Sequence, residues 1–412
     1  MGLFDFWRRK VIRLTDGGFW SQFAGGGSHA GETVSQESVL QIGAAYACAR
    51  KLAEGVSCLP FSMNKVDRRT GALERAADHR LVRILGDQPN ADQPAQQFWE
   101  LVMLQLVLRG NHYSLKLSTG GTLDALEPLP PHPQTYCRRD ARGYREFVVT
   151  CGPRKGVYPE AEVFFIPGFG EELDCGLPVI TLARHTFGRL LALERHQSNL
   201  IRNGVRPSMI LTTKEGAILT PEQRQQVKDN IVAPFTGAGS AGGMMVLEGG
   251  FDVKTVTMTP ADAQMLEQFK FGVEEICRWF GMPPWLVGYT GAASNWGTGL
   301  EQQFRAYATL TLQPYVKRIL GEVRRQLMSP QERARGYEPA MPLDALYEGD
   351  SKTIAEVAER YVRGGIKAPN EIRAQLGLPP KDGGDELRMQ QQMVPVAGTQ
   401  PTEPDDEPDP AA

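Results

Sequence analysis

The sequence predicts an α+β protein in which long helices flank a small module that contains strands. Two segments, 177–203 and 258–281, carry apolar residues at helical spacing, while segments before and between them alternate apolar and polar residues as strands do. Between Arg278 and Glu301 no side chain is charged, although about a quarter of an average chain is. This stretch is rich in Gly, Pro and aromatic residues, so we interpret it as a mobile loop rather than a membrane helix.

The composition is that of an ordinary globular protein with room for two or three domains, since 41% of the 412 residues are hydrophobic. A formal net charge of −3 does not favour a protein that holds nucleic acid through a basic surface. The N-terminus lacks the features of a signal peptide, so we expect a soluble, cytoplasmic chain. Six cysteines without a C-x-x-C pair fit a reducing compartment, and Cys48 and Cys277 are predicted to be buried thiols in helices.

The N-terminal part is predicted to be a mixed domain that follows a flexible, Gly/Ser-rich arm and ends near Gly176. Gly110-Asn111 is typical of a helix stop, and Thr70-Gly71 is typical of a hairpin turn. The predicted helices span 38–57, 79–85 and 95–109, and the predicted strands span 59–66, 112–117, 123–129, 144–150 and 162–166.

The C-terminal part is predicted to be mostly helical. Pro314 falls inside a long helical pattern and is expected to kink it, because proline removes a backbone hydrogen bond. The chain after about Val394 is rich in Pro and acidic residues and is expected to be disordered. The predicted helices span 177–203, 220–232, 259–280, 300–328, 351–363 and 369–376, and the predicted strands span 209–212, 244–247, 251–257 and 339–346.

The helix that leads into the uncharged stretch has a narrow apolar stripe. Its members are three or four residues apart, and the charged residues lie off the stripe. Because one chain alone offers little to cover such a stripe, we expect it to pack against adjacent subunits. The stripe consists of Leu266, Phe269, Val273, Ile276 and Phe280.

A search for catalytic and cofactor motifs favours a protein that is not an enzyme and binds no cofactor or metal. Residues 237–242 formally match the dinucleotide fingerprint, but Pro234 precedes them and a strand-like segment follows, so a hairpin tip is the better interpretation. His185 and His196 are eleven residues apart in one helix, which is not the spacing of a helical metal pair.

The order of elements, together with five motifs, resembles the portal proteins of tailed bacteriophages. The most similar segment is FGVEEICRWFGMPPWLVG at 271–288, which resembles the family's acidic helix and its "gly-val-pro-pro" turn. One departure is that Trp296 follows Asn295, where the family often has an acidic or polar residue. The other four segments lie at 44–60, 199–207, 310–320 (similar to the family's kinked helix) and 364–380 (similar to its N-E-x-R segment).

The resemblance implies a ring of subunits, dodecameric in this family, at one vertex of the virion capsid. Double-stranded DNA would pass through it non-specifically during packaging and ejection. The implied partners are further copies of the chain, the terminase large subunit, the major capsid protein or scaffold, and a head–tail adaptor, with no membrane. Assembly would take place in the bacterial cytoplasm. The implied layout is an arm (1–29), wing (30–176), stem helix (177–203), clip (204–257), second stem helix (258–281), tunnel loop (282–299), kinked helix with wing return (300–349), crown (350–390) and tail (391–412).

The resemblance also implies which residues meet partners. In the tunnel loop, Trp285, Tyr289, Asn295 and Trp296 are candidate DNA contacts, and in the clip Lys214, Glu222, Arg224 and Lys228 are candidates for terminase docking. A lining without free cations lets DNA slide, because each Lys or Arg that neutralises a phosphate strengthens binding. The alternative that the two tryptophans only anchor the loop on neighbouring helices stays open.

Two other functions stay open as alternatives. One is a different phage head or connector protein that threads no DNA. The other is an enzyme that uses a nucleotide at residues 237–243.

Overall fold

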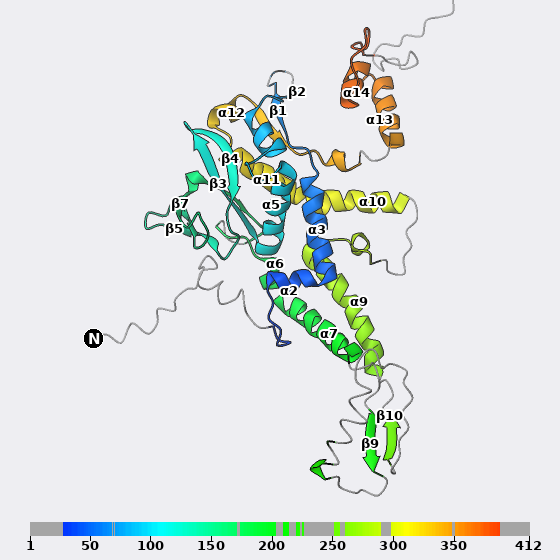
Figure 1. Cartoon of the computed structure of the whole chain (residues 1–412). Coiled ribbons are helices and arrows are strands. Elements are labelled where there is room, and N and C mark those ends of the chain that lie inside the picture. Colours follow the sequence, from blue (N-terminus) through cyan, green and yellow to red (C-terminus); the bar gives the residue numbers. More distant parts are fainter. Residues whose placement is uncertain are drawn as a thin grey trace, which may run out of the picture. The chain divides into compact units, whose positions relative to one another are not determined.

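The computed structural model describes residues 28–67, 69, 71–170, 174–202, 209–213, 220–222, 225, 251–255, 260–289, 298–347 and 351–387. The chain divides into two compact units, Met1–Leu343 and Asp344–Ala412. Helices and strands are mixed throughout the first unit, so the predicted α+β class is confirmed (Figure 1). None of the helices in the described ranges is long and apolar enough to cross a membrane.

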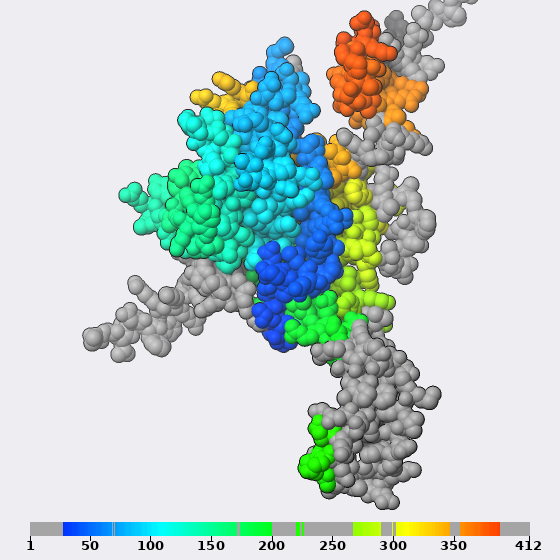
Figure 2. All heavy atoms as spheres, viewed as in Figure 1, coloured from blue at the N-terminus to red at the C-terminus, as the bar shows by residue number. Residues whose placement is uncertain are grey.

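The first predicted helix is two helices, α2 (Gln36–Gln41) and α3 (Gly43–Ser57). Ile42 has an extended backbone with ψ of 113°, which breaks the helix, and its N–H donates to the carbonyl of Val39. A capping box between Ser35 and Ser38 starts α2. Figure 2 shows this blue segment lying against yellow-green residues from much later in the chain.

Two further helices follow the predicted ranges closely. A short α4 (Arg80–Val82) continues as a π-helical turn, η2 (Arg83–Asp87). The helix α5 (Ala95–Arg109) ends at Gly110, whose φ of 79° is the left-handed conformation that glycine adopts most easily. The predicted stop at Gly110 is therefore confirmed.

Three antiparallel sheets accompany these helices. Three of the strands, β2, β5 and β7, were missed by the sequence prediction, and β11 begins two residues earlier than predicted and ends at Ala340. The sheets have the strand orders β11 (Tyr337–Ala340), β1 (Ser62–Val66), β2 (Leu73–Arg75); then β4 (Thr122–Pro128), β3 (Asn111–Thr119), β8 (Val163–Pro167); and β5 (Thr135–Arg139), β6 (Arg145–Val149), β7 (Gly156–Pro159).

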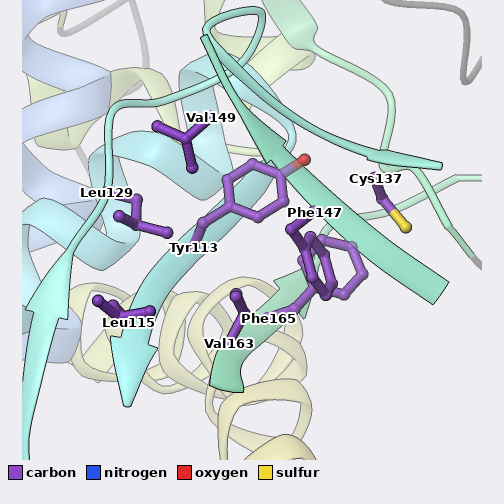
Figure 3. Close-up of a cluster of buried hydrophobic side chains, with 8 residues drawn as sticks. All are labelled: Tyr113, Leu115, Leu129, Cys137, Phe147, Val149, Val163 and Phe165. Carbon is purple, nitrogen blue, oxygen red and sulfur yellow. The ribbon is translucent and has the colours of Figure 1, made fainter. Parts of the chain in front are cut away.

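The sheet β4-β3-β8 and the sheet β5-β6-β7 share an aromatic core (Figure 3). The ring of Tyr113 stacks on Phe165 with centroids 5.2 Å apart, and Phe147 lies 5.2 Å from Phe165. Aromatic side chains bury large apolar areas, so this cluster stabilises both sheets together. Its buried members are Tyr113, Leu115, Leu129, Cys137, Phe147, Val149, Val163 and Phe165.

A buried histidine joins α5 to β3. The ring of His112 is fully buried and lies 2.7 Å from Oε1 of Gln105 through Nδ1 and 2.8 Å from Oγ of Ser114 through Nε2. Because Oε1 of Gln105 can only accept, Nδ1 donates and Nε2 accepts from the serine hydroxyl. Burial lowers the pKa of His112 to about 3, so the ring is neutral.

The predicted helix 177–203 is also two helices. Its first part, α6 (Val179–Leu182), ends at Ala183, and α7 (Arg184–Arg202) follows directly. The strands β9 (Met209–Thr213) and β10 (Phe251–Thr255) lie close to the predicted ranges 209–212 and 251–257, and they pair antiparallel. Of the predicted helix 220–232, residues 221, 222 and 225 are described and helical, and the predicted strand 244–247 lies outside the described residues.

The helix after β10, α9 (Pro260–Phe280), lies beside α7 (Figure 1). Pro314 lies within a long helical segment, as predicted. A π-helical turn, η8 (Ala308–Leu312), lies between α10 (Thr298–Tyr307) and α11 (Gln313–Gln326), and Pro314 is the second residue of α11. A short α12 (Pro330–Ala334) leads back to β11.

The second unit contains α13 (Ser351–Arg363) and α14 (Pro369–Gln375), close to the predicted ranges. Asn370 organises the segment that follows: its side-chain amide donates to Lys381 O and to Asp385 Oδ1, both at 2.9 Å, and accepts from Lys381 N.

Candidate functional site

The helices α7 and α9 form a packed pair. Phe187 and Leu190 of α7 and Ile276 and Phe280 of α9 are buried, and the rings of Phe187 and Phe280 lie 6.4 Å apart. The expectation that the α9 stripe is covered only by adjacent subunits is therefore wrong for Ile276 and Phe280. These two side chains are buried within the same chain, because α7 and α3 both pack against α9.

Gly272 lets the two helices approach closely. A Cβ atom at this position would lie 2.2 Å from Cδ2 of Leu190, closer than real Cβ contacts allow. Glycine normally weakens a helix, so its presence inside α9 is explained by this close approach.

Polar contacts also join α7 to α9. Glu275 of α9 accepts a hydrogen bond of 3.1 Å from the Thr186 hydroxyl and a charged hydrogen bond from Arg189. The indole N–H of Trp279 donates to the same Thr186 hydroxyl at 3.4 Å. Sequence reasoning did not identify this group, because no spacing along the chain links α7 to α9.

Several cations on these helices are paired with carboxylates. Arg189 pairs with Glu275, and Arg195 lies 2.7 Å from Glu32. Arg278 lies 3.5 Å from Glu274 and also over the ring of Phe271, 5.4 Å from its centroid. Pairing reduces the field that each guanidinium exerts on a polyanion nearby.

The first part of the uncharged stretch has a defined structure, which corrects the prediction of a mobile loop for residues 279–289. Trp279 and Phe280 complete α9, and Gly281 turns the chain with φ of 62°. Met282 is buried, and η7, a 3₁₀ turn (Pro284–Val287), follows. Proline favours such a turn because its φ is already fixed. Residues 290–297 lie outside the described part.

Two of the four predicted tunnel-loop residues can be placed. Trp285 lies in η7 and Tyr289 just after it, and both are half-buried. Asn295 and Trp296 lie outside the described residues. Of the predicted docking residues, Glu222 is exposed, whereas Lys214, Arg224 and Lys228 lie outside the described residues.

The described residues hold no group of three or more His, Cys, Asp or Glu side chains that could bind a metal ion. His185 stacks on His29, with ring centroids 3.7 Å apart. The glycine-rich segment 237–242 lies outside the described ranges.

Two solved structures illustrate the likeness of this fold to known proteins. One is described as the neck of an empty gene transfer agent (GTA) particle computed with C6 symmetry. It is 25% identical to this chain, with a TM-score of 0.59. The match covers 82% of this chain and 90% of that chain. Another is an HK97-family phage portal protein from Corynebacterium diphtheriae, with 15% identity, a TM-score of 0.55 and coverage of 77% and 99%. These likenesses show that the chain shares the fold of these proteins.

The family follows from the sequence comparison. The model of the phage portal protein family matches residues 43–377, so the chain belongs to that family. The portal protein of Enterobacteria phage HK97 is 32% identical over 368 residues, which are 88% of this chain and 85% of the relative. The probable portal protein of Streptomyces phage phiC31 is 27% identical over 370 residues, with coverage of 86% and 78%. The resemblance stated from the five motifs is confirmed.

Proposed function

We propose that copies of this chain form a ring at one vertex of the virion and that double-stranded DNA passes through it during packaging and ejection. The family match across residues 43–377 carries this proposal. A similar solved structure is described as the neck of a native GTA particle computed with C12 symmetry, which supports a ring and favours a dodecamer. Assembly in the bacterial cytoplasm belongs to the same proposal.

The charge distribution supports a conduit that DNA can slide past. Each phosphate neutralised by Lys or Arg releases counterions and strengthens binding, so free cations in a bore would hold the duplex. Arg189 and Arg195 on α7 and Arg278 on α9 are each paired with a carboxylate. The chain from Trp279 to Leu300 carries no charge at all.

The proposal includes the ranges given above for the wing, stem, clip, tunnel loop and crown of each subunit. The pairing of β11 with β1 supports the wing return near 330–349. We assign DNA contact to the tunnel loop, with Trp285, Tyr289, Asn295 and Trp296 as the contacting residues. The half-buried position of Trp285 is equally compatible with an anchoring role.

Docking of partner proteins completes the proposal. The clip would bind the terminase large subunit through Lys214, Glu222, Arg224 and Lys228, and a head–tail adaptor after packaging. The wing would contact the major capsid protein or scaffold. The exposed Glu222 is available for such a contact.

Electron microscopy of the purified full-length protein tests the ring. Rings with an open bore about as wide as duplex DNA are expected, and monomers or closed discs would contradict the proposal. Deletion of residues 286–296 should leave the rings intact and impair DNA packaging or retention. Normal packaging with that deletion would remove the role proposed for the loop and would favour a connector that threads no DNA.

A further inference from the structure

Four segments that are far apart in the sequence enclose a crevice in the first unit. They are the chain that leads into α2, the end of α5, the loop after β4 and the turn from α6 into α7. The empty space of the crevice, including the part open to solvent, is about 420 Å³. Its polar lining consists of basic, hydroxyl and amide side chains, and no Asp or Glu of the described residues lines it. These polar residues are Ser35, Gln36, Arg109, His132, Thr181 and Arg184.

The guanidinium of Arg109 has more hydrogen-bond donors than its neighbours use. Its Nε donates to Oε1 of Gln36 at 2.7 Å. The described part of the chain offers it no further acceptor and no carboxylate in an ion pair, so its two Nη atoms keep four N–H donors. Neither Nη atom is sealed from solvent. Because Arg109 lines the crevice, these donors are available to a ligand there.

The crevice also carries a positive charge that is incompletely compensated. Arg109 stays protonated at neutral pH, and burial lowers its pKa by more than the charge of the exposed Glu37 raises it. His132 is neutral, because burial and the charge of Arg109 lower its pKa to about 4. Arg184 adds a second positive charge, and its Nε donates to Nε2 of His185 at 3.4 Å. A cation partly removed from water is stabilised by an anion that reaches it.

We propose that this crevice binds a single oxyanion, a carboxylate or a phosphate ion, through the guanidinium of Arg109. A planar guanidinium can donate two parallel N–H groups to two oxygens of either ion. The hydroxyls of Ser35 and Thr181 can donate to the same ion, and the charge of Arg184 attracts it. A metal cation would find no carboxylate ligand among the described lining residues.

Thermal unfolding of the full-length protein is the first test. Sodium phosphate and sodium acetate are the two probes, and each is compared with sodium chloride at equal ionic strength and pH 7. An anion that binds only the folded protein should raise Tm by on the order of 2 °C at about ten times its dissociation constant, and the rise should saturate. A rise with phosphate identifies a phosphate site, and a rise with acetate identifies a carboxylate site.

Site variants separate binding from the general stabilisation that phosphate gives through its exclusion from protein surfaces. Arg109→Gln should lose the saturable rise in Tm. Arg75→Gln, which removes an exposed arginine of β2, is the matched control and should keep it. The proposal is overturned if neither anion raises Tm above chloride, or if Arg109→Gln keeps the rise.

Chemical protection of the wild-type protein decides the question if Arg109→Gln does not fold. Phenylglyoxal modifies accessible arginines, and trypsin does not cleave after a modified one, so modification of Arg109 yields residues 84–116 as one peptide. The anion that binds should slow the appearance of this peptide several-fold relative to chloride and leave the modification of Arg75 unchanged. An equal rate at Arg109 with and without the anion would overturn the proposal. Neither experiment depends on ring formation or DNA passage, so the inference can fail while the proposed function stands.

Discussion

The hydroxyl of Thr311 donates a hydrogen bond of 2.8 Å to the carbonyl oxygen of Gly281. Thr311 lies in the π-helical turn η8, and Gly281 is the left-handed residue that ends α9. The contact joins one residue on each side of the segment proposed to reach DNA. It therefore fixes where that segment leaves α9.

Replacing Thr311 with valine should release this junction. Valine has the same shape without the hydroxyl, so the free energy of unfolding should fall by about 1 kcal/mol. Hydrogen exchange at residues 281–289 should increase as well. Denaturant unfolding and exchange mass spectrometry measure both effects. Thr119→Val, at an exposed position, is the control and should change stability by less than about 0.5 kcal/mol. Unchanged exchange at 281–289 would show that the hydrogen bond does not hold the segment.

Gly272→Ala tests the close approach of α7 and α9. Alanine in a helix interior is normally about 1 kcal/mol better than glycine, but here the new Cβ meets Leu190 at 2.2 Å. We expect a net loss of about 1–3 kcal/mol, as for an overpacked core. Gly321→Ala in α11 is the matched control, because nothing lies within 4 Å of its Cβ, and it should stabilise the protein. Two variants that shift the unfolding midpoint in the same direction would contradict this packing.

Glu275→Gln should affect non-specific DNA binding more than it affects the free energy of unfolding. The Arg189–Glu275 pair is partly exposed, so its loss should cost about 1 kcal/mol or less. The guanidinium that remains is free to neutralise a phosphate. If the ring conducts DNA past α7 and α9, non-specific duplex binding by the assembled protein should strengthen at low salt, with a salt slope steeper by up to about one. Filter binding across a salt series measures the slope, and Glu338→Gln, on β11, is the control. An unchanged slope would mean that Arg189 faces away from the DNA.

Acid should destabilise the first unit before its carboxylates titrate. Burial lowers the pKa of His112 to about 3 and that of His132 to about 4, so both rings stay neutral in the folded protein at pH 5. In the unfolded chain they take up protons below about pH 6.5. The unfolded state then binds more protons, and stability falls as pH drops from 7 to 5, by about 2 kcal/mol for each histidine.

Denaturant midpoints between pH 7 and pH 5 measure this effect. His112→Asn removes one titrating ring, so its stability should depend less steeply on pH than that of the wild type, whatever its absolute stability. Thr119→Val, which removes no titrating group, is the control and should keep the slope of the wild type. Parallel pH profiles for wild type and His112→Asn would contradict a neutral, buried His112.

Local sequence signals located most of the elements. Gly110 ends α5 where its freedom to adopt positive φ predicts a stop, and α13 spans the range predicted from its spacing. The breaks at Ile42 and Ala183 were not predictable, since neither residue disfavours a helix. The strand β5 was missed because its apolar residues meet their partners on β6 only in the folded protein.

The sequence by itself determined the family, the α+β class, the buried character of Cys48 and Cys277 and the uncharged segment between α9 and α10, because each depends on residue type and order along the chain. The tertiary structure alone decided that α7 covers part of the α9 stripe, that Arg189 is neutralised by Glu275 and that Thr311 holds Gly281. These are contacts between segments distant in sequence, and contacts of this kind are set by how packed helices align in space rather than by any local spacing.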